Sequence, residues 1–124
     1  MKIHYKETAA FQKDLKKLLK KFRTLTEDLE TAKKNALELF HLRKIDNKSV
    51  FPVPNFYNSD FQIYKLKKFA CKSLKGRGVK SGIRVIYAFF PKEMKIIFIE
   101  IYFKANKPNM DYERAENFLK TITL

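Results

Sequence analysis

Cysteine, acidic residues and long apolar runs are scarce in this chain, and each shortage excludes a class of protein. The 124 residues include one cysteine, Cys71, so no internal disulfide can form and a reducing compartment, the cytoplasm, is expected. No apolar run is long enough to span a bilayer, and no apolar signal region follows Met1. The sequence therefore excludes a disulfide-bonded secreted domain and predicts no membrane partner.

Motifs for cofactors and metal ions are also missing. All three glycines lie within residues 76–82, and their spacing completes neither a P-loop nor a dinucleotide-binding fingerprint, which argues against ATP or NAD. The two histidines, His4 and His41, have no ligand-type spacing, so no metal site is expected and both are interpreted as surface or packing residues. The sequence therefore predicts a protein without a cofactor.

Positive charge is what the chain has in excess. It holds 27 lysines and arginines against 13 acidic residues, with a net charge of +14 and a pI near 9.9. A field of this sign concentrates polyanions. The alternative, a soluble surface of mixed charge, usually carries a net charge of about 2–8 in magnitude. With 45% hydrophobic residues, the composition fits a packed core, and residues 1–124 are expected to form a single domain.

Periodicity predicts a strand and two helices in the first part of the chain. Apolar and polar residues alternate over residues 2–6, which favours a short edge strand. An apolar stripe at helical spacing predicts a helix over about residues 8–22. Thr24 and Glu27 have the spacing of a capping box, which would open a second helix over about residues 24–42. With a connection of only a residue or two, the helices should form an antiparallel hairpin.

The remainder is expected to contain a loop, three strands and a helix. Residues 43–60 predict a long loop with a short extended piece near residues 50–53. Strands are expected over residues 61–67, 83–90 and 95–103, the last two joined by a turn at residues 91–94. A helix should run from about 111 to 122 with Asp111 as its N-cap. The order β-α-α-β-β-β-α indicates an α+β fold.

The strand expected over residues 95–103 should present two different faces. One face would hold Ile97, Ile99, Ile101 and Phe103, and the other Phe98, Glu100, Tyr102 and Lys104. A carboxylate in the middle of a sheet needs a partner. Glu100 is therefore expected to form a salt bridge, with a general-base role as the alternative.

The segment Lys65–Arg84 concentrates positive charge without any acidic residue. It holds eight cations: Lys65, Lys67, Lys68, Lys72, Lys75, Arg77, Lys80 and Arg84. Glycine lets the backbone approach a ligand closely, so the glycines among these cations predict a loop that binds phosphate. The alternative is a solvated basic loop. The aromatic residues nearby are expected to be mostly core, with at most two of them stacking on RNA bases.

Three stretches of the chain carry a resemblance to a known family. Residues 11–18 resemble the start of its helical hairpin, and residues 99–104 resemble its last strand. Residues 75–87, which read Lys-Gly-Arg-Gly-Val-Lys-Ser-Gly-Ile-Arg-Val-Ile-Tyr, resemble its Gly-Lys-Ser-Gly-x-Arg-Val-Ile-Tyr signature. The family is the RelE/ParE superfamily of bacterial toxins, and the resemblance is closest to its RelE/HigB-type RNA-cleaving branch. It implies a small RelE-like fold, a twisted antiparallel sheet with an N-terminal helical hairpin on one side and a C-terminal helix.

The resemblance also implies a function and, together with the charge of the segment Lys65–Arg84, it gives a set of candidate site residues. It implies the toxin of a toxin–antitoxin pair, which cleaves mRNA on the ribosome and is inhibited by a cognate antitoxin, expected to be acidic. The candidate catalytic residues are Arg84, Arg77, Lys68, Lys72, Lys104 and Tyr112. The candidate RNA-binding residues are Lys65, Lys67, Lys75, Lys80 and Lys107. Several family members carry an Arg after the last strand, where this chain reads Ala105-Asn106-Lys107, which leaves the leaving-group acid unassigned.

The expected reaction is attack of a ribose 2′-OH on the adjacent phosphate without a metal ion. Arg84 and Arg77 would stabilise the charge that builds on the phosphoryl oxygens. A lysine crowded by like charges has a lowered pKa and would act as base or acid, the candidates being Lys68, Lys72 and Lys104. Three alternatives stay open: a ParE-like inhibitor of DNA gyrase, a non-catalytic RNA-binding module, and a degraded toxin that keeps only its antitoxin-binding surface.

Overall fold

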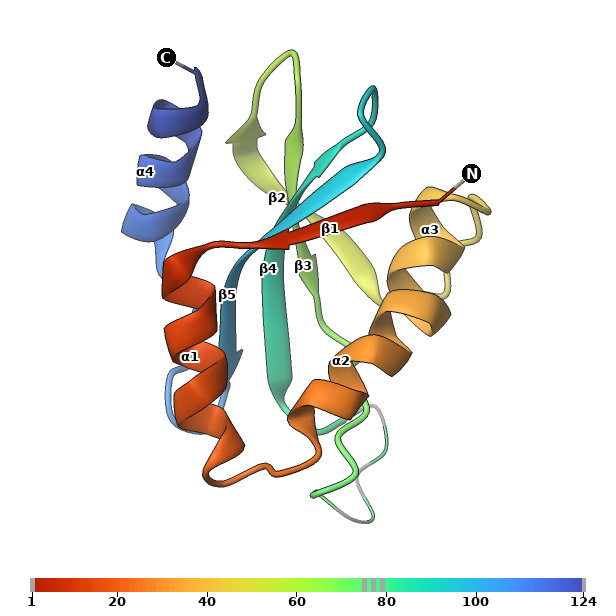
Figure 1. Cartoon of the computed structure of the whole chain (residues 1–124), viewed down its shortest axis with the longest axis vertical. Coiled ribbons are helices and arrows are strands. Elements are labelled where there is room, and N and C mark those ends of the chain that lie inside the picture. Colours follow the sequence, from red (N-terminus) through yellow and green to blue (C-terminus); the bar gives the residue numbers. More distant parts are fainter. Residues whose placement is uncertain (1, 75, 77, 79, 124) are drawn as a thin grey trace.

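The computed structural model describes residues 2–74, 76, 78 and 80–123, which form one sheet with helices on both of its faces (Figure 1). The elements are, in chain order, β1 (His4–Glu7), α1 (Ala9–Leu19), α2 (Leu25–Ala32), the π-helical segment η1 (Lys33–Glu38), α3 (Leu39–His41), β2 (Val50–Tyr57), β3 (Gln62–Leu66), β4 (Ile83–Phe90), β5 (Lys95–Phe103) and α4 (Tyr112–Thr123). The α+β class expected from the sequence is confirmed. Among the helices of the described residues, none has the length and apolar character that crossing a bilayer requires.

The sheet has five strands in the order β1-β5-β4-β3-β2. The pairs β5–β4, β4–β3 and β3–β2 are antiparallel, as expected. The edge strand β1 instead runs parallel to β5, with His4 opposite Lys95. The sheet is therefore mixed, and β1 is the exception to the antiparallel sheet that the resemblance implies. A parallel pair needs a long connection, which the rest of the chain supplies between β1 and β5.

Strand β2 is an element that the sequence analysis did not predict as a whole. Residues 43–60 were expected to form a loop, yet Val50–Tyr57 pairs with β3 along the sheet edge. Buried Val50 and Val53 hold it to the core, and Pro52 is tolerated because an edge strand leaves one row of N–H groups unpaired. The pairing register shifts between Pro52 and Tyr57, where Asn55 has a φ of 71°. The prolines and this irregularity are the reason that the sequence predicted a loop here.

The two N-terminal helical segments lie on one face of the sheet and diverge from their connection (Figure 1). Thr8 caps α1, because its hydroxyl accepts a hydrogen bond from the Phe11 N–H at 3.1 Å. The connection comprises residues 20–24, longer than the expected residue or two. The capping box predicted at Thr24 is absent: the Thr24 hydroxyl donates to the Asp28 carboxylate at 2.7 Å, and the Thr24 backbone, at φ −87° and ψ 1°, is not extended.

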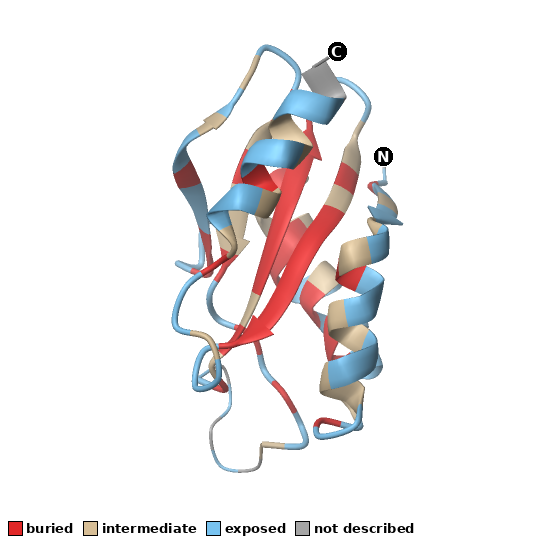
Figure 2. Cartoon of the chain, turned by 90° about the vertical axis from the view of Figure 1, so that its left-hand side faces the viewer, coloured by how far each residue is buried: buried red, intermediate tan, exposed pale blue. Residues whose placement is uncertain are grey.

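Two apolar cores lie on opposite faces of the sheet, and Figure 2 shows buried β5 between α1 and α4. The core on the helical-hairpin side includes Phe11, Leu25, Leu37, Val85 and Phe98. The core on the α4 side includes Val53, Phe61, Ile86, Ile99 and Ala115. The ring centroids of Phe118 of α4 and Phe61 lie 5.5 Å apart, which places α4 over the end of the sheet where β3 begins.

A β-bulge in β5 changes which side chains share a face. Ile86 lies opposite Glu100 and Tyr87 opposite Phe98, so Ile99 is an extra residue in β5. As a result Ile99 packs in the α4-side core, whereas Ile101 and Phe103 pack in the other core together with Phe98. The prediction that Ile97, Ile99, Ile101 and Phe103 share one face was wrong, because strict alternation does not survive a bulge.

Candidate nucleic-acid interface

The residues Ser81, Gly82 and Ile83 fix the start of β4. The buried Ser81 hydroxyl donates to the Phe69 carbonyl and accepts from the Ile83 N–H at 3.1 Å. Gly82 has a φ of +86°, which disfavours any other residue, and its carbonyl accepts the Lys104 N–H at 2.8 Å. These bonds hold together the segment that follows β3, the start of β4 and the end of β5, at one end of the strands.

Arg84 follows immediately and points to the α4 side of the sheet. It stands two residues before Ile86 of the α4-side core, and side chains two apart share a face. Its register partner on β5 is Tyr102. The guanidinium Nη1 donates to the Lys67 carbonyl at 2.9 Å and to the Ile83 carbonyl at 3.4 Å, so the half-buried side chain is held in place; within the described residues, Nε and Nη2 have no hydrogen-bond partner.

Four cations converge around this point: Lys65 of β3, Lys67 after it, Arg84 of β4 and Lys104 after β5. We call them the basic face. Burial lowers the pKa of the Lys65 amine, and the charges of Lys67 and Arg84 lower it further. Lys104 adds to this effect, whereas the Glu100 carboxylate opposes it. The structure therefore brings together cations that three separate segments supply, and this arrangement lowers the pKa of the Lys65 amine.

Glu100 and two tyrosines border the basic face. Glu100 is buried, forms an ion pair with Lys107 and accepts the Asp111 N–H at 2.8 Å, so the salt bridge expected for it is confirmed. Burial and then the Glu100 charge raise the pKa of Tyr102, which keeps its phenol protonated. Tyr112, at the start of α4, is exposed and close enough to influence Tyr102 electrostatically.

Phe51 is an aromatic residue of this site that the sequence analysis missed. It lies opposite Lys65 on β2, it is 37% exposed, and the Lys67 ammonium lies 4.8 Å from its ring centroid. An exposed ring beside cations offers a stacking surface for a base. The signal was present in the β-branched and aromatic residues Val50, Phe51 and Val53, but the prolines among them favoured a loop. Phe61 and Tyr87, by contrast, are buried in the core as expected.

Several predicted site residues lie elsewhere. Lys68 borders a small hollow beside Asp28 of α2, and the Lys72 ammonium pairs with Glu27 at 3.3 Å. Both therefore lie on the helical-hairpin side, away from Arg84. Lys80 is exposed shortly before β4, where its backbone forms an isolated parallel β-bridge with Phe69. Lys75 and Arg77 lie outside the described residues.

A cavity lies on the opposite face from Arg84. It has a volume of about 550 Å³ between α3 and the β2–β3 turn, and it is lined by His41, Tyr64 and Phe89 among others. His41 is buried, its Nε2 lies 2.7 Å from the Tyr87 hydroxyl, and its ring stacks on Phe89 at 4.0 Å. Burial, with a smaller effect of Lys44, lowers the His41 pKa to about 4. His41 is thus a packing residue, one of the two roles expected for it.

The single thiol is also part of the packing. Cys71 is 3% exposed, and burial together with a hydrogen bond to Asp28 raises its pKa. Within the described residues, no three His, Cys, Asp or Glu side chains gather closely enough to hold a metal ion.

Comparison with known proteins gives a structural likeness. No family model matches the chain, and no curated protein does. Among solved structures, the chain is similar to one in the crystal structure of the archaeal RelE–RelB complex from Pyrococcus horikoshii OT3. The likeness has 18% sequence identity, covers 82% of this chain and 93% of that chain, and has a TM-score of 0.47.

Proposed function

We propose that this chain is the toxin of a toxin–antitoxin pair, an endoribonuclease that cleaves mRNA on the ribosome by 2′-OH attack without a metal ion. The observation that carries the proposal is the basic face, where Lys65, Lys67, Arg84 and Lys104 converge next to an exposed aromatic ring and two tyrosines. Cations at this density suit a phosphodiester, and the ring suits an unpaired base.

Lys65 is the proposed base. Its lowered pKa increases the fraction of neutral amine near neutral pH, and a neutral amine can take the proton of a 2′-OH. The 2′-oxygen then attacks the adjacent phosphorus, and the bond from phosphorus to the 5′-oxygen breaks. The products are a 2′,3′-cyclic phosphate and a 5′-hydroxyl.

Arg84 is the proposed stabiliser of the transition state. Negative charge builds on the phosphoryl oxygens during the attack, and a donor that is already fixed in place needs little reorganisation. The hydrogen bond to the Lys67 carbonyl fixes the Arg84 guanidinium in this way. A guanidinium also matches two phosphoryl oxygens with parallel N–H bonds.

Tyr112 is the proposed acid for the 5′-oxygen. It is 51% exposed, whereas Tyr102 is 5% exposed and packs in the α4-side core, so of the two phenols Tyr112 is the one a substrate can reach. Its position at the start of α4 follows from the Asp111 cap, where the carboxylate accepts the Arg114 N–H at 3.0 Å. The antitoxin in this proposal is an acidic protein that covers the basic face.

Mapping mRNA ends on translating ribosomes tests the proposal. The purified protein should produce new 5′-hydroxyl ends within mRNA, and Arg84→Ala should reduce the cleavage rate by about 100-fold or more, because a fixed transition-state donor is lost. Lys92→Ala removes an equal charge from the exposed β4–β5 turn and should leave the rate unchanged.

Two results would contradict the proposal. Uncut mRNA together with inhibition of supercoiling by DNA gyrase would favour the ParE-like alternative. Cleavage by Arg84→Ala at the wild-type rate, with an unchanged circular dichroism spectrum, would show that Arg84 is not part of the active site.

A further inference from the structure

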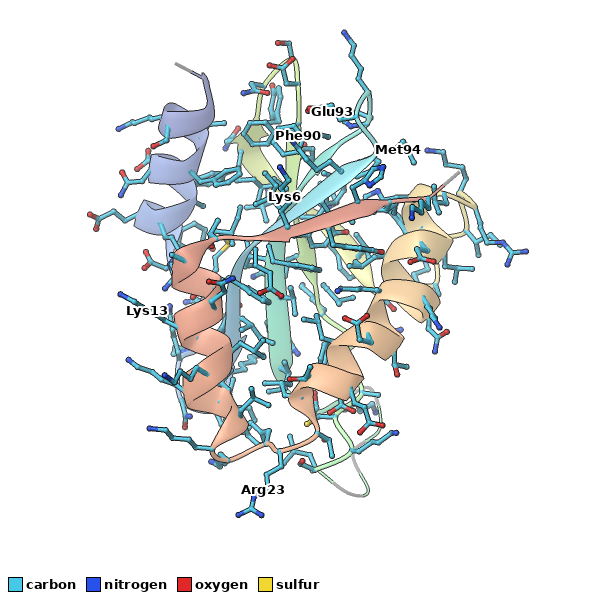
Figure 3. The ribbon with its side chains drawn as sticks, in the orientation of Figure 1. Lys6, Lys13, Arg23, Phe90, Glu93 and Met94 are labelled. Atoms are coloured by element: carbon cyan, nitrogen blue, oxygen red, sulfur yellow. The ribbon has the colours of Figure 1, made fainter. Side chains whose placement is uncertain are left out.

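Helix α1 carries a second concentration of positive charge, separate from the basic face. Lys13, Lys16, Lys17 and Lys20 are all exposed, and we call them the lysine face of α1. Figure 3 shows Lys13 pointing away from the molecule, as Arg23 does beyond the end of α1. The ion pairs of the described residues involve none of these four lysines. Their charge is therefore available to a ligand.

The one acidic residue of α1 does not weaken this charge. Both carboxylate oxygens of Asp14 accept hydrogen bonds from the Arg114 guanidinium, at 2.6 and 3.3 Å. The same carboxylate accepts the Ile101 N–H of β5 at 3.3 Å. Asp14 is thus turned toward the sheet and neutralised by α4, and the outward side of the helix presents only cations and neutral groups.

An open stretch of β5 separates the lysine face from the basic face. The edge strand β1 pairs with β5 only as far as Phe98, so the β5 edge beyond the bulge has no neighbouring strand. A hollow of about 150 Å³ lies at this edge, and it is lined by residues of α1, of β5 and of the turn that follows β5: Asp14, Lys17, Leu18, Ile101, Tyr102, Phe103, Asn106 and Lys107.

This hollow lies between the two cationic surfaces. Tyr102 is the register partner of Arg84, and the Lys107 ammonium lies 5.8 Å from the centroid of the Tyr102 ring. Lys107 and Lys17 line the hollow from its two sides. From Arg84, the line across β5 at Tyr102 leads to the Lys107 side chain, which is 42% exposed and also pairs with Glu100, and then to Lys17 and the rest of α1.

We propose that a single strand of RNA bound at Arg84 continues through this hollow across the β5 edge and onto the lysine face of α1. Lys13 and Lys20 are about 10 Å apart along the helix axis, room for roughly three stacked nucleotides. The inference rests on the proposed function in taking RNA as the ligand, and it adds a site for the nucleotides that flank the scissile bond. It predicts that affinity depends on oligonucleotide length.

Binding of oligoribonucleotides that carry 2′-O-methyl groups tests the inference, because these probes are not cleaved. The α1 variant Lys13→Gln, Lys16→Gln, Lys20→Gln is compared with a control variant Lys2→Gln, Lys34→Gln, Lys92→Gln, which removes the same charge from exposed positions elsewhere. For a probe of about twelve nucleotides, the α1 variant should lose tenfold or more in affinity, and the slope of log K against log salt should become shallower by about 2.

A probe of about three nucleotides should bind the α1 variant and the wild type equally, because it reaches only the basic face. Equal losses for the short and long probes, equal losses for the α1 and control variants, or no RNA binding by the wild type would each overturn the inference. The proposed function can fail while this inference holds. If affinity depends on probe length as expected but mRNA on ribosomes stays uncut, the chain binds RNA along this path and lacks the nuclease activity.

Discussion

Lys65 takes its chemical character from its neighbours on the sheet. An exposed lysine is almost fully charged at neutral pH, whereas burial and three nearby cations lower the pKa of Lys65. Glu100 works against them, so the pKa reflects a balance between charges on three segments. Position on the sheet, and not residue type, therefore gives Lys65 its lowered pKa.

This balance predicts a change in the pH dependence of cleavage. The substitution Lys104→Gln removes one of the charges that lower the Lys65 pKa, so that pKa should rise toward its ordinary value. The neutral amine then forms at higher pH, and the rising limb of the pH–rate profile should shift to higher pH. Single-turnover cleavage rates measured across pH give the shift, and the profile of Lys92→Gln should match the wild type. An unmoved profile for Lys104→Gln would remove Lys65 from the role of base.

His41 makes stability depend on pH. Its pKa is about 4 in the folded protein and about 6.5 in an unfolded chain, so as pH falls from about 6.5 to 4 the unfolded state takes up a proton before the folded state does. The contribution of His41 to the free energy of unfolding is therefore fully present above about pH 6.5. It falls by roughly 3 kcal/mol as the pH drops to about 4. Urea unfolding at several pH values should show the loss.

The second histidine of the chain supplies the control. His41→Gln should flatten the decrease of stability between pH 6.5 and 4, whatever its effect on stability at neutral pH. His4→Gln, on the exposed side of β1, should keep the full decrease. A decrease that persists in His41→Gln would mean that other groups cause it.

At the scale of elements, the contact between the exit of β3 and the entry of β4 depends on one hydroxyl. Ser81→Ala removes the partner of the Phe69 carbonyl and of the Ile83 N–H inside the protein. Unpaired buried polar groups cost about 1–3 kcal/mol, and urea unfolding should show a loss of this size. Ser59→Ala, at an exposed turn, should change the free energy of unfolding by less than about 0.5 kcal/mol. Equal stabilities for the two variants would show that water replaces the Ser81 bonds.

The elements also differ in how well sequence patterns predicted them. Strands β4 and β5 match their predicted bounds, because strong apolar runs flanked by turn residues leave few alternatives. Helix α4 begins after Asp111 as expected, since an Asp there can accept an N–H of the first turn. Strand β2 and the bulge at Ile99 were missed because both depend on pairing with another strand, which local periodicity does not report.

At the scale of the whole molecule, the excess of positive charge was predicted from composition but its arrangement was not. The contiguous segment Lys65–Arg84 was expected to act as one site. The folded chain divides it: Lys65, Lys67 and Arg84 face the α4 side, whereas Lys68 and Lys72 lie beside α2. Lys104 joins the first group from far along the sequence. Only the register of β3, β4 and β5 determines which cations meet, and register follows from long-range pairing.

The single buried thiol, Cys71, also allows local opening of the protein to be measured by thiol labelling. Thiol reagents attack the thiolate, so Cys71, with its raised pKa and 3% exposure, reacts only when the segment around it separates from α2. Because no other cysteine contributes, the labelling rate of the wild-type chain measures how often that separation occurs. Without any substitution or attached dye, the labelling rate of the chain thus reports how often the segment around Cys71 opens.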